Sequence, residues 1–326
     1  MNSPELSLEI GRMQGQVEML TLLLIIVLLI NAGVILWLVL RRSTEHPATT
    51  NSTISEATTI LDDDQTDIVQ QAELLLLRGL NPPPGFLQAL HKLKDYGDGY
   101  NHLLYRFLDA RWRREVSIAD TLSDDLLKRF NEKGAHPWIN LMIADIAAFR
   151  QQADLATEHL RLTLEQRDRE APIWQRMGEA HLMHDEADHA IDCLQKAVEL
   201  EMKLSNAWLQ MGWAELLAHR PDMVDNHLKF AYDFAEPGEE QQVQRRANMV
   251  STLGKAALGY EGEAVTLLDV LLDLHRNKET ACEMLKSLEK VAPLYPDQVP
   301  VFLRLRSMLL KHMEQQGFSH ESMKSN

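Results

Sequence analysis

The stretch that decides the fold runs from residue 171 to residue 231 and reads APIWQRMGEAHLMHDEADHAIDCLQKAVELEMKLSNAWLQMGWAELLAHRPDMVDNHLKFA. Trp174 and Trp208 lie 34 residues apart in it, and Met177-Gly178 and Met211-Gly212 keep the same spacing. Two further matches at this spacing are Leu194 with Leu228 and Ala197 with Ala231. Unrelated helices do not keep large and small residues in such a register, so the chain contains a repeated structural unit of 34 residues.

The repeat extends in both directions along the chain. A first unit at residues 137–170 has matching residues 34 positions before those of the next unit, namely Asn140, Ile143-Ala144, Ala147, Ala156 and Leu160. A fourth unit at residues 244–277 contains Leu253-Gly254, Ala257 and Ala264. Beyond residue 65, apolar residues recur at three- and four-residue steps and no strand pattern is found, so we predict an all-α fold.

These units resemble the tetratricopeptide repeat (TPR), a pair of helices with large and small residues at fixed positions. The second unit matches this pattern at Trp174, Met177, Gly178, His181, Ala190, Leu194 and Ala197. The third unit matches at Trp208, Met211, Gly212, Glu215, Leu228 and Ala231, and departs from it at Val224. The clear resemblance covers residues 137–236 and implies a right-handed TPR-like α-solenoid, in which stacked repeats bury shared faces.

Composition shifts divide the chain into seven predicted segments. They are a short N-terminal tail (1–18), a transmembrane helix (19–40), a flexible linker (41–65), a helical cap or divergent repeats (66–136), TPR-like repeats (137–277), a C-terminal helical cap (278–316) and a disordered tail (317–326). The linker is rich in Ser and Thr without apolar periodicity, which is typical of a flexible spacer.

A membrane anchor is predicted from residues 19–40, which contain no charged side chain. As a helix this segment would span about 33 Å, enough for a bilayer, and it lacks the polar stripe of a helix in a globular protein. Arg41 and Arg42 follow it directly, which favours a cytoplasmic C-terminal domain and leaves the opposite orientation open. Bacterial envelope-assembly factors are similar in layout. We therefore predict a single-pass protein of a bacterial inner membrane that contacts the lipid bilayer through this segment.

Composition and motifs exclude several classes of function. Lys and Arg number 33 against 48 Asp and Glu, and this net charge of −15 argues against a nucleic-acid partner. Cys193 and Cys282 are too few for a disulfide framework or a four-thiolate zinc site. Neither a Gly-rich phosphate loop with lysine nor a G-x-S-x-G motif is present. We expect no catalytic residues, no cofactor and no enzymatic activity.

Histidines and acids gather between the two helices of the second unit. They are His181, His184, Asp185, Glu186, Asp188 and His189. Imidazole and carboxylate groups are suitable metal ligands. His181, however, holds the bulky position of the repeat, and the other residues fall in a solvent-facing turn. We therefore expect no metal site.

The TPR resemblance implies a concave groove, lined by the first helix of each unit, that accepts peptides or helices. Carried over by position, the groove residues are Trp138, Leu141, Asp145, Phe149, Gln175, Glu179, Met183, Leu209, Trp213 and Leu217. Trp213 is notable because Trp208 already fills the core position of its unit. It either anchors a partner or packs under the next repeat. Few bases fall on these positions, so the capture of a C-terminal carboxylate known in the family is not expected.

The sequence thus predicts a membrane-anchored TPR scaffold that binds protein partners through its concave surface and recruits or assembles them at a membrane. Two alternatives stay open: an extracytoplasmic (periplasmic) chaperone-like module with the same fold, and a non-catalytic subunit of an enzyme complex. Neither the partner nor the oligomeric state can be named from the sequence. The similar lipopolysaccharide assembly proteins carry a C-terminal zinc ribbon that this chain lacks, so their function is not transferred.

Overall fold

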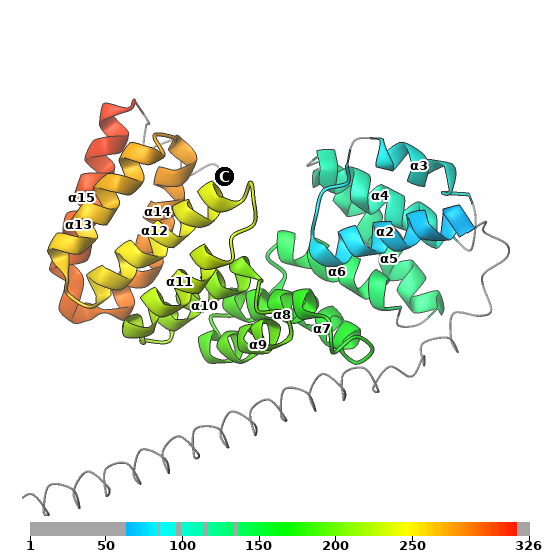
Figure 1. Ribbon diagram of the computed structural model, residues 1–326, viewed down its shortest axis with the longest axis horizontal. Helices are drawn as coiled ribbons and strands as arrows, with labels where there is room; N and C mark the ends of the chain where they lie inside the picture. The colour runs from blue at the N-terminus through cyan, green and yellow to red at the C-terminus, as the bar shows by residue number, and fades with distance from the viewer. Residues whose placement is uncertain (1–62, 84, 96–98, 114–115, 134–135, 318–326) are drawn as a thin grey trace, which may run out of the picture. The chain divides into compact units, whose positions relative to one another are not determined.

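We describe the protein from a computed structural model. The residues it describes are 63–83, 85–95, 99–113, 116–133 and 136–317. They belong to a compact unit that spans Leu61–Asn326. Within these residues every regular element is helical, which confirms the all-α class for this part of the chain (Figure 1).

The helices follow one another through short connections. They are α2 (Asp63–Arg78), α3 (Phe86–Lys92), α4 (Tyr100–Arg113), α5 (Val116–Lys133), α6 (Pro137–Phe149), α7 (Ala153–Leu164), α8 (Ala171–Met183), α9 (Ala187–Leu200), α10 (Ser205–Leu217), α11 (Val224–Asp233), α12 (Glu240–Ala257), α13 (Glu261–Leu274), α14 (Lys278–Val291) and α15 (Val299–Gln315). Short 3-10 turns lie at η1 (Pro221–Met223), η2 (Ala292–Leu294) and η3 (Pro296–Gln298).

Three helix pairs, α6–α7, α8–α9 and α10–α11, keep the predicted register. Their first helices begin 34 residues apart from one pair to the next. Glycine lets the helices of a pair approach closely: a Cβ added to Gly178 would lie 2.7 Å from Leu194 Cγ. The equivalent Cβ at Gly212 would lie 3.2 Å from Leu228 Cδ2. The two repeats therefore bury the same small-against-large contact.

The two tryptophans that set the register have equivalent surroundings. The indole N–H of Trp174 donates to the carbonyl of Asp168 at 2.7 Å. That of Trp208 donates to the carbonyl of Met202 at 2.8 Å. Each bond reaches back six residues, and both rings are half-buried. The indole thereby fixes the connection that enters its own repeat, in the same way in both units.

The turn inside each pair is also repeated, a feature that the sequence pattern did not reveal. Gln151, Asp185 and His219 have φ angles of 58°, 59° and 60°, in the left-handed region. After each of them the next backbone N–H bonds to a carbonyl five residues earlier, at 2.9, 3.0 and 2.9 Å. This arrangement is a Schellman motif, which usually has glycine at the left-handed position. All three repeats thus close with a residue that carries a side chain there.

The pair α12–α13 breaks the register. Its turn has Gly259 at φ 78° and the same closing bond, from Tyr260 N to Lys255 O at 2.9 Å. The first helix is longer, with 18 residues against 13 in α10. Gly254 does not face its own partner helix: a Cβ added to it would meet Val224 of the preceding repeat at 3.3 Å.

The predicted localisation, a single-pass protein of a bacterial inner membrane with its C-terminal domain in the cytoplasm, is wrong as far as the structure describes the chain. Among the described residues no helix is both long and apolar enough to cross a bilayer. The largely apolar α6, for example, has 13 residues and rises only about 20 Å, against a hydrocarbon core of about 30 Å. Residues 19–40, on which the predicted span and bilayer contact depended, lie outside the described residues.

Candidate functional site

The helix α2 packs against α6 and α8, the first helices of the first and second repeats (Figure 1). Its buried side chains Ala72, Leu76 and Leu77 share a hydrophobic cluster with Leu141 of α6 and Met177 of α8. The segment predicted as a helical cap or divergent repeats therefore places one of its helices over the groove that the sequence assigned to α6.

A charged network holds the C-terminal end of α2. Arg176 of α8 donates from Nη1 to Leu77 O and from Nη2 to Leu76 O, each at 2.8 Å. Its Nε lies 2.9 Å from Asp145 Oδ1, and Arg111 lies 3.8 Å from the other oxygen of that carboxylate. Burial raises the pKa of Asp145, and the two guanidinium groups oppose that rise. Cations at this helix end also complement the helix dipole.

A further contact of α2 is made through Glu73, one helical turn before Leu76 and Leu77. The Tyr100 hydroxyl donates to Glu73 Oε1 at 2.9 Å, and burial raises the pKa of that carboxyl group. Trp138, predicted as a groove residue, is buried, and the guanidinium of Arg167 lies 4.0 Å from its ring centroid. Such a cation–π contact and the packing of α2 leave Trp138 no free face for a partner.

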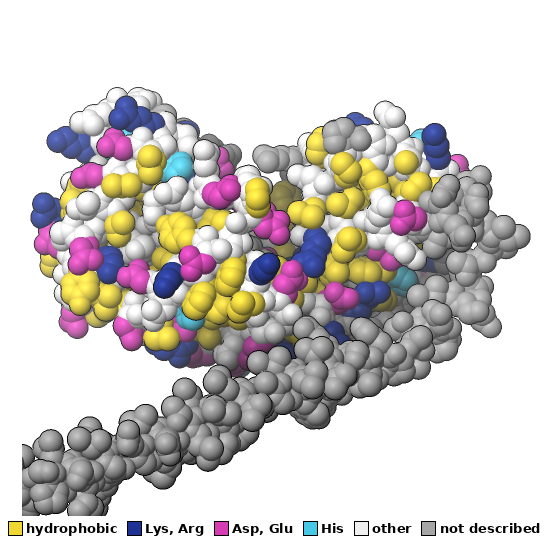
Figure 2. All heavy atoms as spheres, in the orientation of Figure 1, with side chains coloured by type: hydrophobic (Ala, Val, Ile, Leu, Met, Phe, Trp, Pro, Cys, Tyr) yellow, Lys and Arg dark blue, Asp and Glu magenta, His cyan; other side chains and the backbone are white. Residues whose placement is uncertain are grey.

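An open cavity of about 700 Å³ begins where α2 ends. It is lined by α2 and the connection after it on one side, and by α8, α10 and α12 on the other. Leu74 and Leu80 contribute exposed apolar surface, with 54% and 49% of their area accessible, and Leu209 and Val243 form part of the floor. We call this cavity the first-helix groove. Figure 2 shows the hollow with apolar, acidic and basic side chains around it.

Charged side chains line the same cavity. Arg78 of α2 lies 2.7 Å from Glu201, which joins the two walls through an ion pair. Arg246 and Gln242 of α12 form the opposite edge. Arg246 donates to Asn206 Oδ1 at 3.2 Å, and this bond orients the guanidinium along the α10–α12 boundary. The groove therefore offers both apolar and hydrogen-bonding surface.

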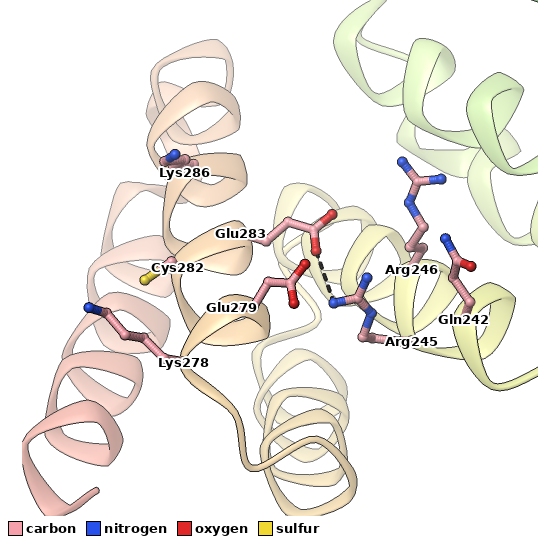
Figure 3. Close-up of a pocket in the computed structure, with 8 residues that line it drawn as sticks. All are labelled: Gln242, Arg245, Arg246, Lys278, Glu279, Cys282, Glu283 and Lys286. Atoms are coloured by element: carbon pink, nitrogen blue, oxygen red, sulfur yellow. Dashed lines mark ion pairs between the residues drawn. The ribbon is translucent and has the colours of Figure 1, made fainter. Parts of the chain in front are cut away.

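A second cavity of about 670 Å³ lies between α12 and α14 and shares Gln242 and Arg246 with the first-helix groove. We call it the α12–α14 cleft. Glu279 and Glu283 extend from α14 towards Arg245, and Arg245 Nη1 lies 3.3 Å from Glu283 Oε2 (Figure 3). Lysines and arginines outnumber acids in its lining: the residues are Gln242, Arg245, Arg246, Lys278, Glu279, Cys282, Glu283 and Lys286.

These basic residues are the part of the candidate site that sequence reasoning missed. None of the predicted groove residues lies on α12, and the segment that forms α14 was predicted as a C-terminal cap. The structure instead brings α12 and α14 together around one cleft. The available signal was the excess of bases on α12, which has three against one acid in a chain whose net charge is −15.

The structure distributes the predicted groove residues over several environments. Trp138, Leu141 and Leu209 are buried, with 6%, 0% and 4% of their area accessible, whereas Phe149 is 62% accessible. Trp213 and Leu217 are half-buried and pack against a hydrophobic cluster. Gln175 and Leu209 line the first-helix groove. The half-buried residues Glu179 and Met183 lie on α8, and Glu179 accepts a hydrogen bond from Gln175 Nε2 at 3.2 Å.

The fold and the groove define a helical-repeat protein whose first helices border a solvent-open cavity. No protein-family model matches the chain, and no curated protein matches it. Several solved structures are similar to it. A crystal structure of MamA is 20% identical in sequence, and the match covers 52% of this chain and 93% of the MamA chain with a TM-score of 0.43.

Two further similar structures are of proteins described as TPR proteins. TTC0263 from Thermus thermophilus is 13% identical, with coverage of 57% and 98% and a TM-score of 0.46. YrrB, described as having an unusual peptide-binding site, is 13% identical, with coverage of 59% and 99% and a TM-score of 0.40. Because these TM-scores are all below 0.5, the assignment of TPR-like repeats rests on the contacts that recur every 34 residues within the chain itself.

Proposed function

We propose that this chain is a protein-binding scaffold that holds a segment of a partner protein in the first-helix groove, and that it has no catalytic activity of its own. The observation that carries the proposal is the open cavity of about 700 Å³ between α2 and the helices α8, α10 and α12, which continues into the α12–α14 cleft. A surface that joins apolar patches to ordered charged groups suits a peptide better than a small apolar ligand.

The packing of α2 indicates what kind of segment fits this surface, namely a helix with one apolar face. This helix already docks on α6 and α8 through Ala72, Leu76 and Leu77, with its last carbonyls bonded to Arg176. Helix-in-groove recognition uses the same elements, an apolar stripe and polar contacts at one end. The rest of the face, along α10 and α12, is open to a segment of the same kind.

The charge of the α12–α14 cleft suggests which charge the partner segment carries. Arg245, Arg246, Lys278 and Lys286 line the cleft with two glutamates, in a chain of net charge −15. We propose that the partner is an amphipathic segment whose apolar residues face Leu80 and Leu209 and whose acidic residues reach this cleft. Charge complementarity of this kind selects partners and raises association rates more than it raises affinity.

Site-specific photo-crosslinking in cells tests the proposal. A photoreactive amino acid at Leu80, Gln242 or Lys286, on the groove and the cleft, should yield a discrete crosslinked partner. The control positions Lys229 and Asp269, exposed on the second helices α11 and α13, should not yield it. Equal crosslinking from both sets of positions would contradict a binding site in the groove.

A pair of charge-reversal variants then tests whether the partner segment is acidic where it meets the cleft. Lys286→Glu should weaken the crosslink formed from Gln242, because it repels acidic residues of the segment. Lys229→Glu changes the net charge by the same amount at an exposed position of α11 and should leave the crosslink intact. Equal weakening by both variants would show a general charge effect instead of recognition in the cleft.

A further inference from the structure

A cluster of potential metal ligands lies at the turn between α8 and α9. His181 Nδ1 is 2.7 Å from Glu186 Oε2, and His189 Nδ1 is 3.6 Å from the same oxygen. The centroids of the two imidazole rings are 5.4 Å apart. One ligand atom from each of the three residues lies within 4.8 Å of the others. Two imidazoles and a carboxylate therefore converge on one point.

The backbone fixes the positions from which these side chains start. His181 is in the last turn of α8, Glu186 is the N-cap residue of α9, and His189 follows in the first turn of α9. The Glu186 N–H bonds to His181 O at 3.0 Å, so the Schellman turn at Asp185 ties two of the three residues together. A ligand set built on helix ends and a closed turn is preorganised.

The turn itself does not require these residue types. The first repeat builds the same turn with Ala147, Gln152 and Leu155 at the equivalent positions. The third repeat builds it with Glu215 and Arg220, which form an ion pair there at 2.5 Å. The same turn therefore forms in the other two repeats without this set of residue types, and the backbone geometry alone does not require the two histidines and the glutamate.

We propose that His181, Glu186 and His189 bind one divalent transition-metal ion of the zinc type. Imidazole nitrogens with one carboxylate suit zinc, cobalt, nickel or copper, whereas magnesium and calcium prefer oxygen ligands alone. Metal–ligand bonds of about 2.0–2.2 Å hold such atoms about 3.3 Å apart in a tetrahedral site. The Glu186 side chain is 46% accessible, so it has room to move from its present hydrogen bond to that position.

The surroundings of the cluster leave the ion accessible. His189 is 69% accessible, and the neighbouring Asp185 is engaged with Lys290 at 2.6 Å. His184 lies 3.4 Å from Asp154 Oδ1 of α7, so it is held beside the site by another element. Three protein ligands leave a coordination position for water, and the bound ion links the end of α8 to the start of α9.

Zinc binding by the untagged full-length chain tests the proposal. After removal of metals with a chelator, ZnCl2 added at pH 7.5 in a calorimeter should give saturable binding of one ion per chain. Glu186→Gln and His189→Ala should each weaken binding about tenfold or more. Both positions are exposed, so the variants fold, and circular dichroism verifies this. His102→Ala, at an exposed position of α4, is the matched control and should bind zinc like the parent.

Two further measurements separate a built site from loose association. Cobalt in place of zinc should give visible absorption bands of low-symmetry coordination that disappear in the His189→Ala variant. Zinc should raise the melting temperature of the parent chain more than that of Glu186→Gln, since binding to the native state stabilises it in proportion to the logarithm of the affinity. Binding that does not saturate, or that is equal in the parent and both site variants, would overturn the proposal.

Discussion

The close approach of α8 and α9 leads to a prediction that uses two equivalent glycines as a matched pair. In Gly178→Ala the new Cβ would lie 2.7 Å from Leu194 Cγ and 3.2 Å from Ala190 O. Carbon atoms have their optimal contact at about 3.5–4.0 Å. Leu194 is fully buried, and Cγ is the branch point of its side chain, so a rotation of the methyl groups cannot relieve the overlap. In Gly212→Ala the nearest atom is a methyl carbon, Leu228 Cδ2, at 3.2 Å.

The magnitude follows from the difference between the two variants. Each replaces a helical glycine by alanine, which alone favours the helix by about 1 kcal/mol, and this term cancels between them. Overpacking of a tight core costs about 1–3 kcal/mol and applies chiefly to the Gly178 variant. We therefore expect Gly178→Ala to be less stable than Gly212→Ala by about 1–3 kcal/mol. Gly212→Ala should be close to the parent or slightly more stable.

Urea unfolding followed by circular dichroism measures this difference, with the slope of the transition compared among the three proteins. A repeat protein can unfold in more than one step, so equal slopes are needed before the free energies are compared. If Gly178→Ala proves as stable as Gly212→Ala, the two helix pairs do not differ in closeness, and the reasoning from the 2.7 Å and 3.2 Å contacts is refuted.

Three further predictions concern the turn, the α2 contact and a buried histidine. Gln151→Gly should raise the free energy of unfolding by about 0.5–1 kcal/mol, since glycine removes the cost of the left-handed φ of 58°; thermal melting measures it. Arg176→Met should lower that free energy by about 3 kcal/mol in urea titrations, because Asp145 keeps a buried charge without its nearest cation. Burial lowers the pKa of His159 in the native state. As the pH falls below about 6.5, this histidine therefore takes up a proton in the unfolded state before it does so in the native state, which favours unfolding. Stability should thus be complete above that pH and decline below it, more shallowly in His159→Gln, as measured by urea unfolding at pH 7.5 and pH 5.5.

The controls for these predictions are equally specific. Gln152→Gly, at φ −94°, should destabilise the chain, since glycine there adds only flexibility to the unfolded state. A stabilised Gln152→Gly would show that the gain at Gln151 does not come from its backbone angle. An Arg176→Met variant as stable as the parent would mean that α2 does not depend on the charged network. An unchanged pH slope in His159→Gln would assign the decline to other groups.

The repeats were predictable because their contacts are local and periodic. The residues Trp174, Gly178 and Leu194 meet within one helix pair, so a spacing of 34 residues is enough to identify them and their counterparts. The six-residue hydrogen bond of each indole is local for the same reason. The register fails at α12, where Gly254 follows Gly212 by 42 residues instead of 34 and a Cβ on it would meet Val224 of the preceding repeat.

The candidate site was less predictable because its contacts join distant parts of the chain. Arg176 bonds to carbonyls about a hundred residues earlier, on a helix that belongs to no repeat. Which side of a first helix stays open depends on the neighbours that cover it, α2 at α6 and α12 at α10. For this reason Leu141 and Trp213, placed on the groove by analogy, pack against hydrophobic clusters.

The position of α2 couples affinity to an internal equilibrium. Under the proposed function, a ligand short enough to stay along α10, α12 and α14 would meet a preformed surface and bind with its intrinsic dissociation constant. A ligand long enough to reach α6 would compete with α2 for the same face. Its apparent dissociation constant is then the intrinsic one divided by the fraction of molecules in which α2 has detached. The length of the partner segment would then affect its affinity. Each contact that stabilises α2 against detachment, such as the bonds from Arg176, would increase the difference in affinity between short and long segments.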